Sequence, residues 1–193
     1  MIYIGLDIST TTIGYSAIVI KDKKITNVYY DYYCPNKKLD SISLIVDAKD
    51  KIINAINNII SKHNEDKDIY VCVEDILLQA TKTTAMTITK LAGINRTLCV
   101  AMKENFGNLK LIYVQTIRAQ LKRMAGRTDR VDKESVPDVL QEIVSKHIKD
   151  WTFDFELKKI GKKKGEKKIE NYDKADGMAV ALAGAYLNKE ILI

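Results

Sequence analysis

The segment "MIYIGLD", residues 1–7, carries the pattern that decides the fold of this chain. Ile2, Ile4 and Leu6 alternate with a tyrosine, a glycine and, at the end, Asp7. A period of two residues is typical of a β-strand, whose side chains point alternately to the two faces of a sheet. We therefore predict that the chain opens with a strand and that this strand ends in a carboxylate.

Two further strands are predicted directly after it. The segments "TIGYSAIVI" (12–20) and "ITNVYYDYY" (25–33) are rich in β-branched and aromatic residues, and the polar turn "KDKK" (21–24) separates them. Strands joined by so short a turn pair antiparallel. The first 33 residues are therefore expected to form a three-stranded antiparallel meander.

The rest of the chain alternates helix and strand patterns. Apolar residues recur at helical spacing in the segment 42–63, whereas "IYVCVED" (69–75) is a short apolar run typical of a central strand. The other predicted elements are a helix over 83–105, a strand over 109–114, a short helix after Thr116, a helix over 133–147 and a final helix from about Asp173. This order predicts an α/β fold of the ribonuclease H-like class, with a five-stranded mixed sheet, its first three strands antiparallel, flanked by helices.

Length and composition indicate one globular unit. The chain has 193 residues, of which 46% are hydrophobic and 29% charged, and we expect a single domain over residues 1–193. No apolar run approaches the roughly 18–20 residues of a membrane span and no signal segment opens the chain, so an intracellular protein without membrane contact is expected. The three cysteines are far apart and lack C-x-x-C spacing, which disfavours a disulfide framework or a zinc site.

The charge is positive and concentrated in one run. A formal net charge of +6 fits a polyanionic partner. Residues 158–168, "KKIGKKKGEKK", hold seven lysines and one acid and are too polar to pack, so a lysine-rich loop is predicted over about 156–170. This loop is either a solvated surface loop or an arm that contacts phosphates.

Four acidic residues stand where the predicted fold gathers functional groups. Asp7 and Glu74 end the first and fourth strands, and α/β sheets collect their sites at such carboxyl ends. Asp173 and Asp176 are three apart at the start of the final helix, so their side chains share one face. If the fourth strand lies beside the first, the four carboxylates meet. Such a group needs a hard cation, and two Mg²⁺ or Mn²⁺ ions would support phosphodiester hydrolysis.

Each acid also has a structural interpretation. Asp173 and Asp176 would stabilise a helix start by accepting backbone hydrogen bonds and by complementing the helix dipole. Asp7 alone is compatible with a turn, and Glu74 with a solvated strand end. The agreement of spacing and strand order across the chain favours the metal site.

The sequence resembles a known family. The motifs "IGLDISTTTIGYSAI" (4–18), "VCVEDI" (71–76) and "DKADGMAVALA" (173–183) resemble those of the RuvC-like Holliday junction resolvases, and the resemblance covers nearly the whole chain. It implies four catalytic acids that also bind the metal, namely Asp7, Glu74, Asp173 and Asp176.

The segment 114–144 resembles the family's stretch after the fifth strand, in which two functional lysines lie eleven residues apart. Lys122 and Lys133 have this spacing, and the resemblance implies a catalytic role for both. A slip of one position would select Arg123 in place of Lys122, and Lys133 is alternatively a surface lysine in the first turn of a helix.

The resemblance implies a homodimer that binds a four-way DNA junction and nicks two opposed strands. It further implies two Mg²⁺ ions in each active site, Mn²⁺ as a substitute, no nucleotide cofactor, and a location in the cytoplasm of a bacterial or phage-infected cell. Basic side chains would hold phosphates in a largely shape-directed contact. The predicted DNA-binding residues are Lys82, Arg118, Arg123, Arg127, Arg130, Lys162, Lys163 and Lys164.

The chain departs from the family pattern in three places. Ile8 and Ser9 stand where bacterial members often have Pro-Gly, and Leu77 stands where a bacterial member has an aromatic residue that stacks on a base. The segment between Lys133 and Asp173 is longer than is usual in the family, because it includes the lysine-rich run.

Other functions are compatible with parts of the sequence. The same metal site would serve cleavage of forks, flaps or RNA-containing duplexes. The segment "LDISTTTIGYSAI" (6–18) also resembles the first phosphate loop of actin-like kinases and ATPases, although 193 residues and nine glycines leave no room for that fold's second domain and adenosine loop. A catalytically silent junction-binding module is a third alternative, and the presence of all four acids argues against it.

Overall fold

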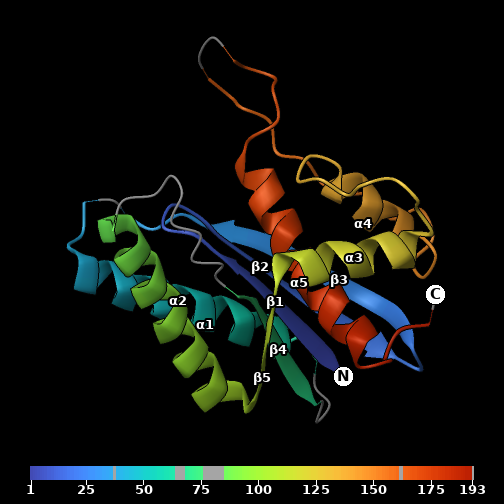
Figure 1. The fold of residues 1–193 in the computed structure, drawn as a ribbon, viewed down its shortest axis with the longest axis horizontal. Coiled ribbons are helices and arrows are strands. Elements are labelled where there is room, and N and C mark those ends of the chain that lie inside the picture. Colours follow the sequence, from blue (N-terminus) through green and yellow to red (C-terminus); the bar gives the residue numbers. More distant parts are fainter. Residues whose placement is uncertain (37, 64–67, 76–84, 161–162, 193) are drawn as a thin grey trace.

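The computed structural model describes residues 1–36, 38–63, 68–75, 85–160 and 163–192, and its centre is a five-stranded sheet (Figure 1). In spatial order its strands are β3 (Lys24–Tyr33), β2 (Ile13–Lys21), β1 (Ile2–Ile8), β4 (Ile69–Glu74) and β5 (Asn108–Ile112). The strands β1 and β4 pair in parallel, as do β4 and β5, whereas β1 and β3 each pair antiparallel with β2. This arrangement confirms the predicted mixed sheet and its ribonuclease H-like order.

Helices cover both faces of the sheet (Figure 1). One layer is formed by α1 (Ser41–Ile60) and α2 (Ala85–Phe106), and the other by α3 (Val114–Ala125), α4 (Val136–Val144) and α5 (Glu170–Leu187). None of the helices in the described part of the chain is long and apolar enough to cross a membrane.

The alternation in β1 decides which side chain goes to which layer. Ile2, Ile4 and Leu6 belong to the hydrophobic cluster that α1 and α2 cover, and Tyr3 belongs to the cluster on the side of α3, α4 and α5. Successive side chains of a strand point to opposite faces. Asp7 therefore points to the face on which α5 lies.

Helix α5 approaches the sheet unusually closely. A Cβ atom on Gly5 of β1 would lie 2.1 Å from the carbonyl oxygen of Gly177, and one on Gly14 of β2 would lie 1.8 Å from the carbonyl oxygen of Asp173. Both distances are far inside van der Waals contact, so only glycine permits this approach. The approach brings the start of α5 to the end of β1.

Several predicted helix boundaries differ from the structure, and two of these differences bear on the predicted site residues. Helix α5 begins at Glu170, before Asp173, because its first turn is fixed by the buried side chain of Asn171, which bonds the segment in front of the helix. Helix α4 begins at Val136, with a proline in its first turn, and so Lys133 precedes the helix. The interpretation of Lys133 as a first-turn lysine is therefore wrong.

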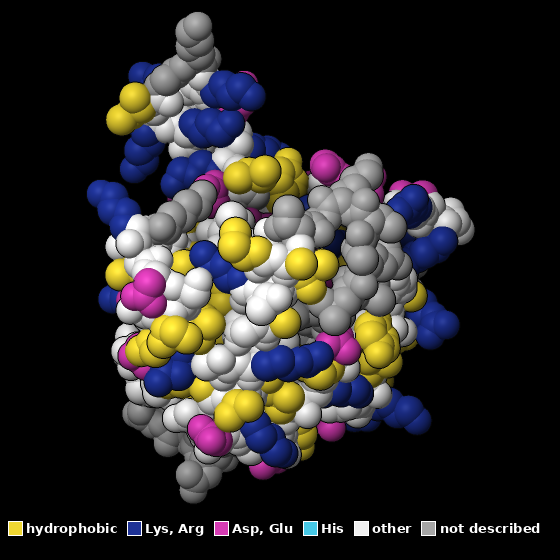
Figure 2. All heavy atoms as spheres, turned by 60° about the vertical axis from the view of Figure 1, so that its left-hand side comes forward, with side chains coloured by type: hydrophobic (Ala, Val, Ile, Leu, Met, Phe, Trp, Pro, Cys, Tyr) yellow, Lys and Arg dark blue, Asp and Glu magenta, His cyan; other side chains and the backbone are white. Residues whose placement is uncertain are grey.

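Residues 157–168 are here termed the lysine arm, and their described parts, 157–160 and 163–168, pair as a hairpin within the predicted lysine-rich loop. Leu157 and Lys167 pair in an antiparallel bridge, and the amide of Lys158 donates to the carbonyl of Glu166 at 2.8 Å. The arm projects from the body just ahead of α5, at the top of Figure 1. Figure 2 shows basic side chains gathered along it, and in this segment they are all lysines.

The close approach of α5 gives a first prediction. Gly5→Ala is expected to lower the free energy of unfolding by about 2–3 kcal/mol, because the added methyl group overlaps the backbone of α5. The matched control is Gly93→Ala in α2, where the nearest atom, Cδ1 of Ile45, lies 3.4 Å away. This control should keep or gain stability, by up to about 1 kcal/mol. Urea unfolding followed by circular dichroism measures both variants, and equal stabilities would contradict the prediction.

Candidate active site

Asp7 and Glu74 lie at the same edge of the sheet. Strands β1 and β4 are parallel neighbours, and their register carries these two residues to the same level. Asp7 also pairs across with Gly14 of β2, and Gly14 packs directly on the backbone of Asp173. The carboxyl ends of β1 and β4 and the start of α5 therefore meet, as the sequence predicted.

The carboxylates at this edge raise one another's pKa. Burial raises the pKa of Asp7 well above its ordinary value, and the charges of Glu74 and Asp176 raise it further. Burial likewise raises the pKa of Glu74 to about 7, again with a contribution from Asp176. Burial raises the pKa of Asp176 too, although Arg118 opposes this shift. These groups are thus close enough to repel one another, which is the crowding expected of a cation site.

Two basic side chains compensate the acids of α5. The Nζ atom of Lys133 lies 2.8 Å from Oδ1 of Asp173 and 3.6 Å from Oδ2 of Asp176. The Nη2 atom of Arg118 donates to Oδ1 of Asp176 at 2.5 Å. Burial alone would lower the pKa of Lys133, but its bond to Asp173 and the nearby carboxylates raise it. Lys133 is therefore held in its charged form among the carboxylates.

The aspartate pair of α5 faces this lysine and not the helix start. The N-cap position is Ile169, and no side chain caps the helix there. Lys133 contacts both Asp173 and Asp176, so their carboxylates do point to a common position. The arrangement matches the expected sharing of a cation better than the capping interpretation.

Arg118 belongs to this cluster, although the sequence placed it only among the DNA contacts. Its Nη1 atom is buried and has no hydrogen-bond partner within the described ranges. The sequence offers one signal for this position: Arg118 lies four residues before Lys122, so both side chains share one face of α3 and either can point toward the carboxylates. Of these two residues of α3, Arg118 reaches the carboxylates and Lys122 does not.

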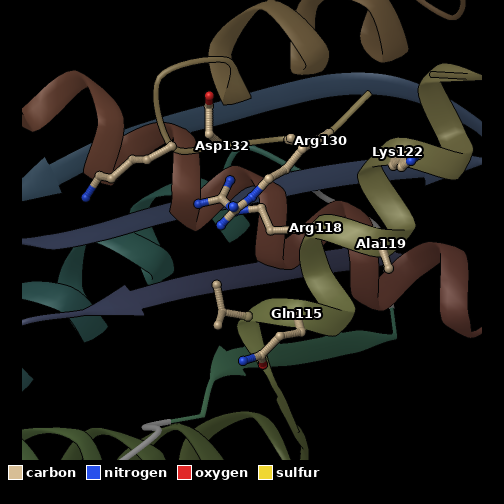
Figure 3. A pocket seen from close by; sticks show the side chains of 9 residues that line it. Gln115, Arg118, Ala119, Lys122, Arg130 and Asp132 are labelled. Atoms are coloured by element: carbon tan, nitrogen blue, oxygen red, sulfur yellow. The ribbon is translucent and has the colours of Figure 1, made fainter. Parts of the chain in front are cut away.

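Lys122 is directed elsewhere. Its Nζ atom donates to the carbonyl of Thr128. In Figure 3, Lys122 lies apart from Arg118 and Arg130. These residues line a groove of about 560 Å³ between α3 and the segment 130–133. The groove is open and basic, and it lies beside the carboxylates because Arg118 takes part in both.

The remaining predicted residues lie at several places. Arg127 donates to Glu142 of α4 through Nε at 2.9 Å, and so ties the loop after α3 to α4. Ser9 closes the turn after Asp7, because its hydroxyl donates to the carbonyl of Thr12 at 2.7 Å. Arg123, Arg130 and, on the lysine arm, Lys163 and Lys164 are exposed. Lys82, Lys162 and Leu77 lie outside the described residues.

A metal site was expected from the four acids. Among the described residues, no group of three or more Asp, Glu, His and Cys side chains is close enough together to hold a metal ion. Lys133 and Arg118 compensate Asp173 and Asp176, whereas Asp7 and Glu74 make no ion pair within the described part of the chain. Asp7 and Glu74, with their raised pKa values, and the two aspartates on α5 offer the carboxylate oxygens that a hard divalent cation takes. The residue types therefore fit such an ion, although their spacing in this structure does not enclose one.

The fold is similar to that of solved structures of RuvC. The structure of RuvC from Thermus thermophilus is similar over 98% of this chain and 96% of its own chain, with a TM-score of 0.66 and 15% sequence identity. A T. thermophilus RuvC in complex with a Holliday junction substrate matches over 98% and 95%, with a TM-score of 0.63 and 13% identity.

A third similar structure is the yeast mitochondrial Holliday junction resolvase Ydc2, which matches over 97% of this chain and 78% of its own, with a TM-score of 0.57 and 13% identity. No protein-family model and no curated protein matches the sequence. At these identities the likeness shows the fold, and the resemblance inferred from the sequence motifs is confirmed at that level.

The raised pKa of Glu74 predicts how stability depends on pH. In the absence of metal, the folded state binds more protons than the unfolded state between the ordinary pKa of 4.5 and the folded value of about 7. The free energy of unfolding should therefore fall as pH rises through this range. Glu74→Gln should remove the part of this fall that Glu74 contributes, while Asp7 and Asp176, whose pKa values burial also raises, keep their part. The variant should raise the unfolding free energy by about 2 kcal/mol at about pH 8.

Thermal unfolding in EDTA from about pH 5 to about pH 8 measures this difference. Glu104→Gln, on the exposed side of α2, is the control for loss of one negative charge. Parallel pH profiles of wild type and Glu74→Gln would show that Glu74 is not crowded by the other acids.

Proposed function

We propose that this protein is a metal-dependent, structure-selective endodeoxyribonuclease that resolves four-way DNA junctions as a homodimer. The observation that carries the proposal is the convergence of Asp7, Glu74, Asp173 and Asp176 at one edge of a RuvC-like sheet. The acids come from β1, β4 and α5, which are rigid elements packed against each other. Such a frame holds a charged site in place without reorganisation.

The four carboxylates would hold Mg²⁺ in two positions, with Mn²⁺ as a substitute. When bound, the ions supply activation of the attacking water and stabilisation of the leaving oxygen. The protein's own contribution is the position of the ligands. Asp7 and Glu74 are fixed by the paired ends of β1 and β4, and the two aspartates of α5 by the contact of this helix with Gly14.

Arg118 and Lys133 are assigned to the DNA phosphate at the cut site. Each bonds an aspartate of α5, and each keeps donors for a further acceptor. Nη1 of Arg118 has no partner within the described ranges, and the side chain of Lys133 is 47% exposed. Charge-assisted hydrogen bonds from such groups to phosphate oxygens are strong. The groove between Arg118 and Arg130 provides a path for the backbone next to the carboxylates.

A twofold dimer suits a junction with near-twofold symmetry, because it presents two identical sites to two opposed strands. The T. thermophilus RuvC of the same fold was solved with a Holliday junction substrate, which supports branched DNA as the ligand. Forks, flaps and RNA-containing duplexes require the same phosphodiester chemistry and are the alternative substrates.

A substrate panel tests the proposal. The protein is incubated with an immobile four-way junction, a fork, a matched linear duplex and an RNA–DNA hybrid, with Mg²⁺ or with chelator, and the products are resolved on a denaturing gel. Paired nicks in opposed strands of the junction, absent with chelator, are expected.

Asp7→Asn should abolish cleavage and preserve junction binding, because it removes a charge with almost no change in shape. Cleavage by this variant at the wild-type rate would overturn the site assignment.

Arg118 gives a separate prediction. Arg118→Gln should lower the single-turnover cleavage rate about 10²-fold, because it removes a donor beside the reacting phosphate. Junction affinity should change less than about threefold, since most affinity comes from other phosphate contacts. Lys103→Gln at the exposed end of α2 removes the same charge away from the site and serves as control. A loss of affinity as large as the loss of rate would show that Arg118 only binds DNA.

A further inference from the structure

The positive charge of this protein lies in the lysine arm. Of the 31 basic and 25 acidic residues of the chain, seven lysines and one glutamate belong to residues 157–168. The other 181 residues therefore carry 24 groups of each sign, so the formal charge of +6 resides entirely in twelve residues. A solvated loop of average composition would not concentrate the charge of the whole molecule.

The described residues of the arm pair with each other as a hairpin. Besides the bridge between Leu157 and Lys167, the amide of Gly165 donates to the carbonyl of Lys158 at 2.9 Å, and Gly165 has a φ of 90° that suits the turn. Lys159 and Lys164 are exposed and make no ion pair within the described ranges, and Lys163 lies 4.0 Å from its nearest acid. The hairpin thus holds several uncompensated cations away from the body.

The root of the arm is fixed to α5 by one buried side chain. Asn171 is fully buried, and its Nδ2 atom donates to the carbonyls of Glu156 and Lys168, both at 2.8 Å. Its Oδ1 atom accepts from the amide of Glu156 at 2.9 Å. Asn171 therefore clamps both strands of the arm at their base, two residues before Asp173.

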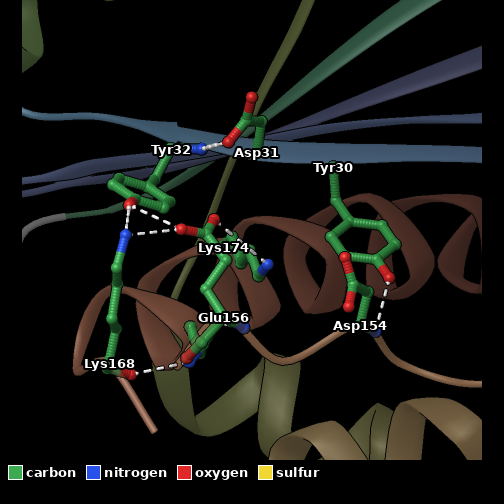
Figure 4. Close-up of polar contacts among 8 residues, drawn as sticks. Tyr30, Asp31, Tyr32, Asp154, Glu156, Lys168 and Lys174 are labelled. Carbon is green, nitrogen blue, oxygen red and sulfur yellow. Dashed lines mark hydrogen bonds and ion pairs between the residues drawn. The ribbon is translucent and has the colours of Figure 1, made fainter. Parts of the chain in front are cut away.

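Glu156 joins the same root to β3 (Figure 4). Its carboxylate accepts from Nζ of Lys168 at 2.6 Å and from the hydroxyl of Tyr32 at 3.2 Å. The buried Nζ of Lys174 lies 3.6 Å from the other carboxylate oxygen, and 5.5 Å from the ring centre of Tyr30. A network of this kind, with each polar group satisfied, holds one geometry. The arm and the aspartates of α5 are thus parts of one rigid unit.

We propose that the lysine arm is a separate nucleic-acid contact, which binds the phosphate backbone of a DNA duplex leading away from the cut site. Glu156 and Asn171 are its positioning residues, because they set the direction of the arm relative to Asp173 and Asp176. The identity of the polyanion as DNA rests on the proposed function. The arm is favoured as a DNA contact over a membrane contact because its root adjoins the carboxylate edge, where the same DNA would lie.

The charge of the arm is tested by binding in EDTA, where cleavage is not required. The variant Lys159→Gln, Lys163→Gln, Lys164→Gln is compared with Lys21→Gln, Lys23→Gln, Lys24→Gln, which removes three equally exposed lysines at the opposite end of the sheet. Fluorescence anisotropy with a four-way junction and a linear duplex gives affinity as a function of salt. The arm variant should reduce the slope of log K against log salt by about 2–3 and the control variant by less than about 1.

Equal reductions in the two triple variants would overturn the proposal, because the charge would then act without a specific contact. The same proteins are mixed with vesicles of phosphatidylcholine and phosphatidylserine in equal parts, since Ile160 of the arm is 89% exposed. Unchanged DNA binding with loss of vesicle binding in the arm variant would assign the arm to a membrane surface and also overturn the proposal.

The positioning role has its own measurement. Glu156→Gln keeps all seven lysines of the arm but replaces the charged bond from Lys168, so a misplaced arm should contact fewer phosphates and the salt slope should fall toward that of the arm variant. Hydroxyl-radical footprinting of the junction should also show weaker protection of the duplex outside the cut site, and because no lysine is lost, both effects would come from the placement of the arm. A wild-type footprint in a folded Glu156→Gln protein would show that the root does not position the arm. A different outcome concerns the wild-type protein. If it shows the arm-dependent footprint and salt slope but cleaves none of the substrates, the arm contact is supported and the proposed nuclease activity is wrong.

Discussion

The contact between the backbone of α5 and strands β1 and β2 is the constraint on which the rest of the structure depends. Gly5 and Gly14 leave no atom between the sheet and the carbonyls of Gly177 and Asp173. A helix held by side-chain packing alone lies about 10 Å from a sheet and tolerates small shifts. Here backbone touches backbone, so the aspartates of α5 are fixed relative to Asp7 with little freedom.

This contact brings the carboxylates of β1, β4 and α5 close together, and the basic side chains of Lys133 and Arg118 lie beside them. The pKa values of Asp7, Glu74 and Asp176 are raised because burial and mutual repulsion disfavour their ionised forms. Lys133 and Arg118 form ion pairs with the aspartates on α5, and their charges also oppose the rise in the pKa of Glu74. Among the described residues, the strand carboxylates Asp7 and Glu74 have no ion pair of their own. A divalent ion beside the strand carboxylates and a phosphate beside the two basic side chains would complete the cluster.

The sequence predicted those parts that depend on local pattern. The alternation in residues 1–7 and the acids at strand ends led to the sheet order and to the meeting of Asp7 with Glu74, because strand parity and strand ends are visible in the sequence. Contacts made across the fold were not visible. Hydrogen bonds from Asn171 to the base of the arm let α5 begin before the predicted start at Asp173. Lys122 bonds the carbonyl of Thr128, and Arg118 is the residue of α3 that bonds Asp176. The arm was read as a loop since its lysines show no alternation and its order comes from Glu156 and Asn171.

The separation of a neutral body from a charged hairpin gives the molecule a large electric dipole whose positive end is the arm. In the field of a polyanion, such a molecule turns its positive end toward the partner before contact. This orientation raises the association rate, and the effect is largest in low salt. Because the arm is clamped to the first turn of α5, turning the arm toward a polyanion also turns the carboxylate edge with it. The charge distribution would therefore select, during diffusion, the encounters that are already in a productive orientation.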